Sequence, residues 1–148
     1  MTEIETLLAI EAIKRIKAIY FYGLDHKDWD LWRREVFAPD ATLIVPEAQV
    51  EVRGIDDIID WVSARTGDQV SVHHGHMPII DIASDTAATA IWAMEDRLYR
   101  TQEQPLEDGS GYLHGFGHYH ESYVRLGAGW RIASTRLSRL RVEMRRIF

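Results

Sequence analysis

The stretch "YFYGLDHKDWD" (residues 20–30) marks the place where a long amphipathic helix ends and an aromatic segment begins. Before it, apolar residues recur at every third or fourth position, which is the spacing of a buried helical stripe. The stripe consists of Ile4, Leu7, Leu8, Ile13, Ile16 and Tyr20. Thr2 and Glu5 have the pattern of a capping box, and Gly23 is a suitable stop, so the sequence predicts a helix over residues 2–23.

The aromatic segment predicts a second, short helix. Asp28 is a suitable N-cap, and the helix would carry Trp29, Trp32 and Phe37. Pro39 then ends it, because proline cannot continue a helix.

Turn residues divide the rest of the chain into strands and one more helix. The predicted elements are strands over 41–47 and 48–54, a helix over 54–67, and strands near 69–83, 86–101, 111–126 and 129–145. Because helices precede a run of long antiparallel strands, the predicted class is α+β. We expect one domain over residues 1–148, a cone-shaped α+β barrel whose N-terminal helices pack on a curved, mixed, mostly antiparallel sheet. A pocket would lie between the concave face of the sheet and the first helices.

Composition limits the classes of function. The 148 residues are 46% hydrophobic and carry a net charge of -6. The hydrophobic fraction is enough for a real core, and the acidic balance argues against binding nucleic acid. The chain has no cysteine, which excludes disulfides and thiolate metal sites. With no signal-peptide pattern and no apolar run of membrane-spanning length, we expect a cytoplasmic protein without a membrane partner.

Histidines raise the question of a metal site. His74 and His76 share one face of a predicted strand, as do His118 and His120 of another. Two such pairs on neighbouring strands could bind zinc or iron. The spacing is common by chance in a chain with seven histidines, so we predict no metal and no cofactor.

An acid–base site is the competing interpretation of the histidines. A histidine base needs a carboxylate that fixes its tautomer and stabilises its charged form. Asp25 follows the first helix among aromatic residues, where a carboxylate is costly unless it is paired. It is equally compatible with capping the next turn or with facing water.

A second acid lies further along the chain. Asp96 falls on the same strand face as Trp92, and Arg136 on the same face as Trp130. An inward arginine could pair with Asp96 or hold an anionic or carbonyl-bearing ligand. A purely structural buried ion pair is the alternative.

Taken together, these motifs resemble the SnoaL-like proteins of the nuclear transport factor 2 superfamily over nearly the whole chain. The motifs, in chain order, are "YFYGLDHKDWD", "FAPDATLIVPE", "VRGIDDIIDWV", "VHHGHMPIIDIASDTAATA" and "HESYVRLGAGWRIAS". Each is weak alone, but their order and spacing are specific for the fold. The superfamily contains enzymes, ligand-binding modules and dioxygenase small subunits, so the fold does not decide the function.

The resemblance implies a site in the dehydratase and dehydrochlorinase branch. There, an aspartate after the first helix pairs with a histidine on the first long strand, and these positions correspond to Asp25 and His73. His73 precedes Pro78 by the family's interval of five, whereas strand periodicity alone favours His74 as the inward residue. The further implied roles are substrate-oxygen contact for Tyr20, substrate binding for Asp96 and Arg136 as in bile-acid dehydratases, and pocket lining for His118 as in scytalone dehydratase-like members.

The predicted function is therefore acid–base chemistry without a cofactor. The resemblance implies a dehydratase or isomerase, and the aromatics near the helices suit a flat, hydrophobic, cyclic substrate such as a steroid, polyketide or terpenoid. A non-catalytic small-molecule-binding module is the main alternative. An interaction subunit like the small chain of ring-hydroxylating dioxygenases is the third. Tyr119, Tyr123 and residues 137–140 are expected on the outer face of the sheet and predict a homo-oligomer, either a dimer or a trimer.

Overall fold

One mixed, six-stranded sheet with helices on one side forms the architecture of the computed structural model, which describes residues 1–67, 69–127 and 129–148. Its elements are α1 (Glu3–His26), α2 (Trp29–Leu31), a π-helical turn η1 (Trp32–Val36), β1 (Phe37–Val45), a 3-10 turn η2 (Pro46–Ala48), β2 (Val50–Arg53), α3 (Ile55–Thr66), β3 (Val70–Ile82), β4 (Ala87–Tyr99), β5 (Tyr112–Leu126) and β6 (Gly129–Arg145). The predicted α+β class is confirmed, although the sheet is not closed into a full barrel. Among the described residues, none of the helices is long and apolar enough to cross a membrane.

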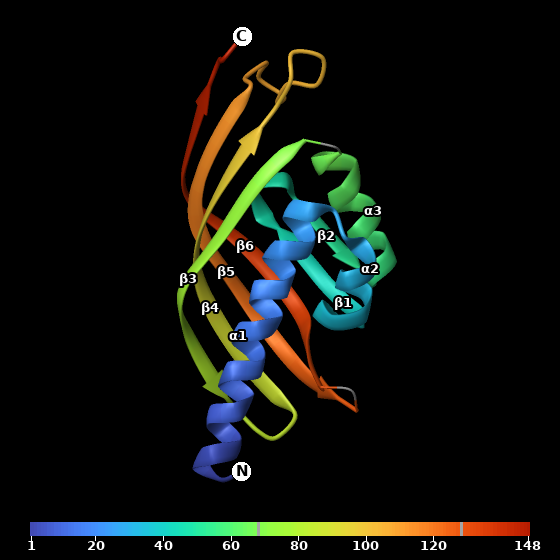
Figure 1. The fold of residues 1–148 in the computed structure, drawn as a ribbon, viewed down its shortest axis with the longest axis vertical. Helices are drawn as coiled ribbons and strands as arrows, with labels where there is room; N and C mark the ends of the chain where they lie inside the picture. The colour runs from blue at the N-terminus through green and yellow to red at the C-terminus, as the bar shows by residue number, and fades with distance from the viewer. Residues whose placement is uncertain (68, 128) are drawn as a thin grey trace.

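The sheet has the strand order β2-β1-β6-β5-β4-β3, so β2 and β3 are its edges. All pairings are antiparallel except that of β1 with β6, which is parallel. Figure 1 shows α1 lying across the curved sheet, with α2 and α3 beside β1 and β2. We call the sheet face that α1 covers the inner face.

Helix α1 begins as predicted but ends later. The capping box is present, since the Glu5 N–H donates to the Thr2 hydroxyl at 3.2 Å and the Thr2 N–H donates to the Glu5 carboxylate at 2.7 Å. Gly23 does not stop the helix, which instead ends at Lys27 with a left-handed backbone (φ 58°). Gly23 is needed for close packing, because a Cβ there would lie 2.7 Å from the indole ring of Trp32.

Only part of the predicted stripe on α1 is buried. Ile13 and Ile16 pack in the core together with Tyr20. Ile4, Leu7 and Leu8 are 70%, 63% and 65% exposed. The first turns of α1 extend past the end of the sheet, so no described part of the chain covers them (Figure 1).

The prediction that Tyr119 and Tyr123 lie on an apolar outer face of the sheet is also wrong. Both residues are buried on the inner face of β5, at 4% and 2% exposure. Alternate residues of β5 are buried from Gly115 onward, so His118 and His120 lie on the outer face instead.

Candidate active site

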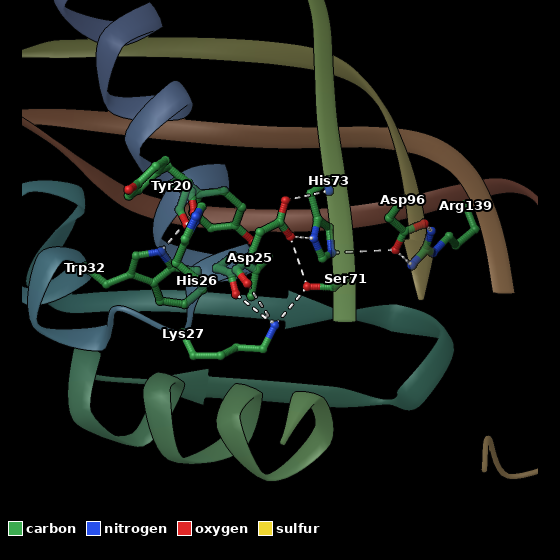
Figure 2. Close-up of polar contacts among 11 residues, drawn as sticks. Tyr20, Asp25, His26, Lys27, Trp32, Ser71, His73, Asp96 and Arg139 are labelled. Atoms are coloured by element: carbon green, nitrogen blue, oxygen red, sulfur yellow. Dashed lines mark hydrogen bonds and ion pairs between the residues drawn. The ribbon is translucent and has the colours of Figure 1, made fainter. Parts of the chain in front are cut away.

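Asp25, in the last turn of α1, is joined to the edge strand β3 by three hydrogen bonds (Figure 2). Its Oδ1 lies 2.7 Å from His73 Nδ1 and accepts the Ser71 hydroxyl at 3.0 Å. Its Oδ2 accepts the backbone N–H of His73 at 2.9 Å. Lys27 Nζ donates in turn to the Ser71 hydroxyl at 2.9 Å. Both carboxylate oxygens are therefore occupied, and the orientation of the His73 ring is fixed.

These contacts determine the protonation state of the pair. Burial acts to raise the pKa of Asp25, but the hydrogen bonds from the His73 ring, the His73 backbone and Ser71 outweigh it, so the pKa is lowered. An ionised carboxylate only accepts hydrogen bonds, and Nδ1 of His73 must then carry a proton. In the neutral ring, Nε2 is left as the basic nitrogen.

The Nε2 side of His73 faces a second carboxylate, that of Asp96 on β4. Asp96 is 2% exposed, and its Oδ2 lies 3.9 Å from His73 Nε2. Arg139 of β6 binds both oxygens of Asp96, with Nη2 at 2.7 Å from Oδ2 and Nη1 in a short contact with Oδ1. Gly115 makes room for this ion pair, because a Cβ there would lie 2.3 Å from Asp96 Oδ1.

The arginine that pairs with Asp96 is not the predicted Arg136. A β-bulge inserts one extra residue, Ala133, between two ladder pairs of β5 and β6. The bulge reverses the alternation, so that Thr135 is buried and Arg136 is exposed on the opposite face. The sequence holds one signal for Arg139, since the two arginines are three residues apart and cannot share a face of one strand.

His73 is the inward histidine of β3, as the resemblance implies. Its side chain is 7% exposed, whereas that of His74 is 52% exposed. The polar face of this strand turns inward because Asp25 supplies its hydrogen-bond partner. The register shifts between Gly75 and Pro78, so the face that points inward changes along the strand.

The histidine pairs do not form a metal site. Strand β4 separates β3 from β5, so the two pairs are not on neighbouring strands. Across residues 1–67, 69–127 and 129–148, no group of three or more histidines and acids is placed to hold an ion. His118 lies on the outer face, and the expectation that it lines the pocket is wrong because that face points away from α1.

An open cleft of about 940 Å³ between α1 and β3 reaches His73. Its walls include Lys17 and Phe21 of α1 and Trp92 of β4. The ring of Phe21 packs directly on Gly75, where a Cβ would lie only 2.5 Å away. The cleft therefore offers a mainly apolar surface, open to solvent, with the imidazole of His73 in its wall.

With the fold and this geometry established, comparison with known proteins identifies the family. A model of the SnoaL-like domain matches residues 5–136. The chain belongs to the SnoaL-like domain family.

Relatives of this SnoaL-like chain include one curated protein and several solved structures. The probable cyclase FGR4 of Gibberella zeae is 28% identical over 145 residues, covering 89% of this chain and 91% of that protein. A hexachlorocyclohexane dehydrochlorinase (LinA) type 2 has a TM-score of 0.84 at 13% identity, with 99% and 95% coverage of this chain and of that one. A candidate scytalone dehydratase of Novosphingobium aromaticivorans has a TM-score of 0.81 at 20% identity, with 99% and 97% coverage. At these identities, the two structures show a shared fold.

Tyr20 lies in the aromatic core of the SnoaL-like domain rather than in the wall of the cleft. It is 5% exposed, and its ring stacks on Trp32 with centroids 4.9 Å apart. Its ring also lies edge-on to that of Tyr119, with centroids 5.7 Å apart. Burial and the charge of Glu121 raise its pKa, so the phenol stays protonated.

A buried ion pair beside these rings escaped the sequence analysis. Lys17 Nζ lies 2.6 Å from Glu121 Oε1, and neither side chain is more than 1% exposed. Thr135 donates to Glu121 Oε1 at 2.9 Å, and Tyr123 donates to Oε2 in a short hydrogen bond. Burial lowers the pKa of Lys17 to about 8, against the raising effect of Glu121. The sequence contains a signal for this pair. Lys17 lies between Ile13 and Tyr20 on the apolar face of α1, and Glu121 lies between two tyrosines that are buried in the structure.

Proposed function

We propose that this SnoaL-like chain is a cofactor-independent acid–base enzyme, a dehydratase or an isomerase that acts on a cyclic hydrophobic substrate. Steroid-, polyketide- and terpenoid-like molecules are the candidate substrates. The observation that carries the proposal is the 2.7 Å contact of Asp25 with His73 Nδ1, because it leaves Nε2 as an oriented base. The fold shared with dehydrochlorinase and dehydratase structures and the likeness to a probable cyclase are consistent with it.

In the proposed mechanism, His73 Nε2 removes a proton from the carbon next to a carbonyl group. The electron pair of that C–H bond forms a carbon–carbon double bond as the C–O bond of a β-hydroxyl breaks. The proton returns from Nε2 to the departing hydroxyl, so water leaves and the ring becomes neutral again. In an isomerase, the same proton returns to a different carbon. Asp25 stabilises the charged imidazole, and such general acid–base help contributes roughly a hundredfold to ten-thousandfold.

We assign the substrate oxygen to Arg139, because its Nη2 binds the same oxygen of Asp96 that lies 3.9 Å from His73 Nε2. Its side chain is 20% exposed, and it holds Asp96 while retaining further N–H donors. By neutralising Asp96, it also limits the competition of that carboxylate for His73 Nε2. Tyr20 is screened from the cleft, so the proposal gives the polarising step to Arg139 and leaves Tyr20 to hold the aromatic wall.

A comparison of two histidines on opposite faces of the sheet tests this function. Purified protein is incubated with a panel of cyclic β-hydroxy-ketones, and the loss of water is followed by mass spectrometry and by the absorbance of the enone. His73→Ala and Asp25→Asn should lose about a hundredfold to ten-thousandfold in rate. His118→Ala, a matched change of a histidine on the outer face of β5, should stay within about twofold. Turnover by His73→Ala at the wild-type rate would rule out the proposed base.

A non-catalytic binding module is the second candidate, and one observation favours it. Asp25 accepts the backbone N–H of His73, so the carboxylate also anchors the edge strand and has a structural reason to be there. This candidate predicts that Asp25→Asn lowers the melting temperature and that the wild-type protein binds the cyclic ketones without converting them.

A further inference from the structure

A second hollow, of about 610 Å³, lies between the C-terminal end of α3 and the ends of β4, β5 and β6. Its floor includes Leu98, Leu113 and Met144, which are cross-strand partners on adjacent strands. Leu98 lies two residues after Asp96 on the same face of β4. The apolar row of Leu98, Leu113 and Met144 is therefore next to the ion pair that contains Asp96. We call this space the end hollow.

Arg100 is the next residue on that face and lies in the wall of the end hollow. Its Nη2 donates to the carbonyl of Arg65 at 2.9 Å and its Nη1 to that of Thr66 at 3.4 Å, at the end of α3. Its Nε is buried and has no hydrogen-bond partner, and within the described chain no carboxylate lies within ion-pair distance. An unsatisfied donor on a charged group is unfavourable, and an anionic oxygen would satisfy it.

Other charges around the end hollow do not cancel that of Arg100. Glu107 and Asp108 also line it, but both are exposed, and water screens their charges. The Asp108 carboxylate accepts the N–H and the hydroxyl of Ser110, both at 2.9 Å. Arg65, at the rim, has its guanidinium carbon 3.9 Å from the ring centre of Trp61.

The end hollow is separate from the dyad. The space between them, which Leu98, Arg100 and Ser71 line, is too small to hold a water molecule. A ligand of the end hollow therefore does not reach His73, and its binding is independent of the acid–base site.

We propose that the end hollow binds the carboxylate end of an amphipathic cyclic acid, with Arg100 as its charged partner and the apolar row beneath its rings. The inference goes beyond the proposed function and does not rest on it, because the end hollow is a second binding site, separate from the cleft at His73.

Calorimetric titration with a matched pair of probes tests the proposal. 2-Naphthoate carries the required charge, and 2-naphthylmethanol has the same rings without it. Arg100→Met should weaken naphthoate binding roughly tenfold to a hundredfold, as expected for loss of a charge-assisted hydrogen bond, and should change naphthylmethanol binding by less than about threefold. Arg53→Met, which removes an exposed arginine of β2, is the control and should change neither. Equal loss for both probes, or no loss for naphthoate, would overturn the proposal.

Two further measurements keep the proposal testable if Arg100→Met does not fold. A crystal structure of the unmodified protein with 2-naphthoate should place the carboxylate beside Arg100, and a carboxylate bound in the cleft beside His73 instead would overturn the assignment. Asp25→Asn should bind naphthoate with unchanged affinity. Because this binding does not depend on the dyad, a failure of the proposed chemistry and a failure of the proposed acid site give different results.

Discussion

Replacing one member of the buried pair of Lys17 and Glu121 should destabilise the protein more than replacing both. In Lys17→Met, the carboxylate of Glu121 keeps the hydroxyls of Thr135 and Tyr123 but loses its counter-ion in a fully buried site. Breaking a buried pair from one side costs about 3–5 kcal/mol. Glu121→Gln leaves the ammonium of Lys17 uncompensated and should cost about the same. The double variant has no buried charge and keeps one acceptor oxygen at position 121, so we expect it to be at least as stable as either single variant, a recovery of at least ~3–5 kcal/mol relative to the sum of the singles.

Urea unfolding at pH 7, followed by circular dichroism, measures all four stabilities. A double-mutant cycle then isolates the coupling, provided that the urea dependence stays similar in the four proteins. If Lys17→Met unfolds within about 1 kcal/mol of the wild type, or if the two single effects add, the pair does not have the assigned role.

The same pair predicts a dependence on alkaline pH. In the unfolded chain Lys17 titrates near ~10.4, whereas in the folded protein its pKa is about 8. Between these values the unfolded state binds more protons, so this group adds stability as the pH rises. The stability difference between wild type and Lys17→Met should therefore grow from pH 8 to pH 10. A difference that shrinks over this range would contradict the burial effect on the ammonium group.

Four further outcomes test the site and its surroundings. Arg139→Met should reduce activity at least about tenfold and Arg136→Met should leave it unchanged, in the enone assay; the reverse order would refute the bulge argument. Gly115→Ala should push apart the ion pair of Asp96 and Arg139 and lower activity in the enone assay, while circular dichroism shows little loss of folded structure. Full activity would show that the ion pair is not needed. Because the pKa of Asp25 is lowered in the folded protein, this group adds stability above pH ~4, and that stability is lost as the pH falls through the folded pKa. Asp25→Asn should remove this acid dependence in urea unfolding measured from pH 5 to pH 2. An unchanged dependence would point to other carboxyl groups. The exposed apolar turns of α1 should support self-association; sedimentation velocity should show more than one chain per particle, and Leu7→Asp should lower that mass, whereas a monomeric wild type would refute it.

The sequence was enough for the order of the elements and for the acid that contacts the histidine. Local periodicity and turn residues are strong in α1, α3 and the long strands, so these were predicted to within a few residues. The contact of Asp25 with His73 is present, and Asp96 is buried. Their catalytic roles stay predictions.

The strand residues that point toward the inner face were predicted less well, because the inward face of a strand depends on its contacts with neighbouring strands. The bulge at Ala133 and the shift after Gly75 each reverse which residues point inward, and neither leaves a clear mark in the strand pattern. Arg136 was therefore named instead of Arg139. The exposed start of α1 was missed for a similar reason, since periodicity shows that a face is apolar but not that this chain covers it.

Asp25 holds the ring and the backbone N–H of one residue at once, and that residue lies on an edge strand. Strand β3 cannot slip by one position without offering the carboxylate a neighbour's N–H and moving the imidazole away from it. Correct docking of this edge strand and assembly of the proposed base are therefore a single event. If the proposed function holds, local opening of that edge would stop turnover while the rest of the sheet remained intact, so turnover would report on the docking of β3 before any spectroscopic sign of unfolding.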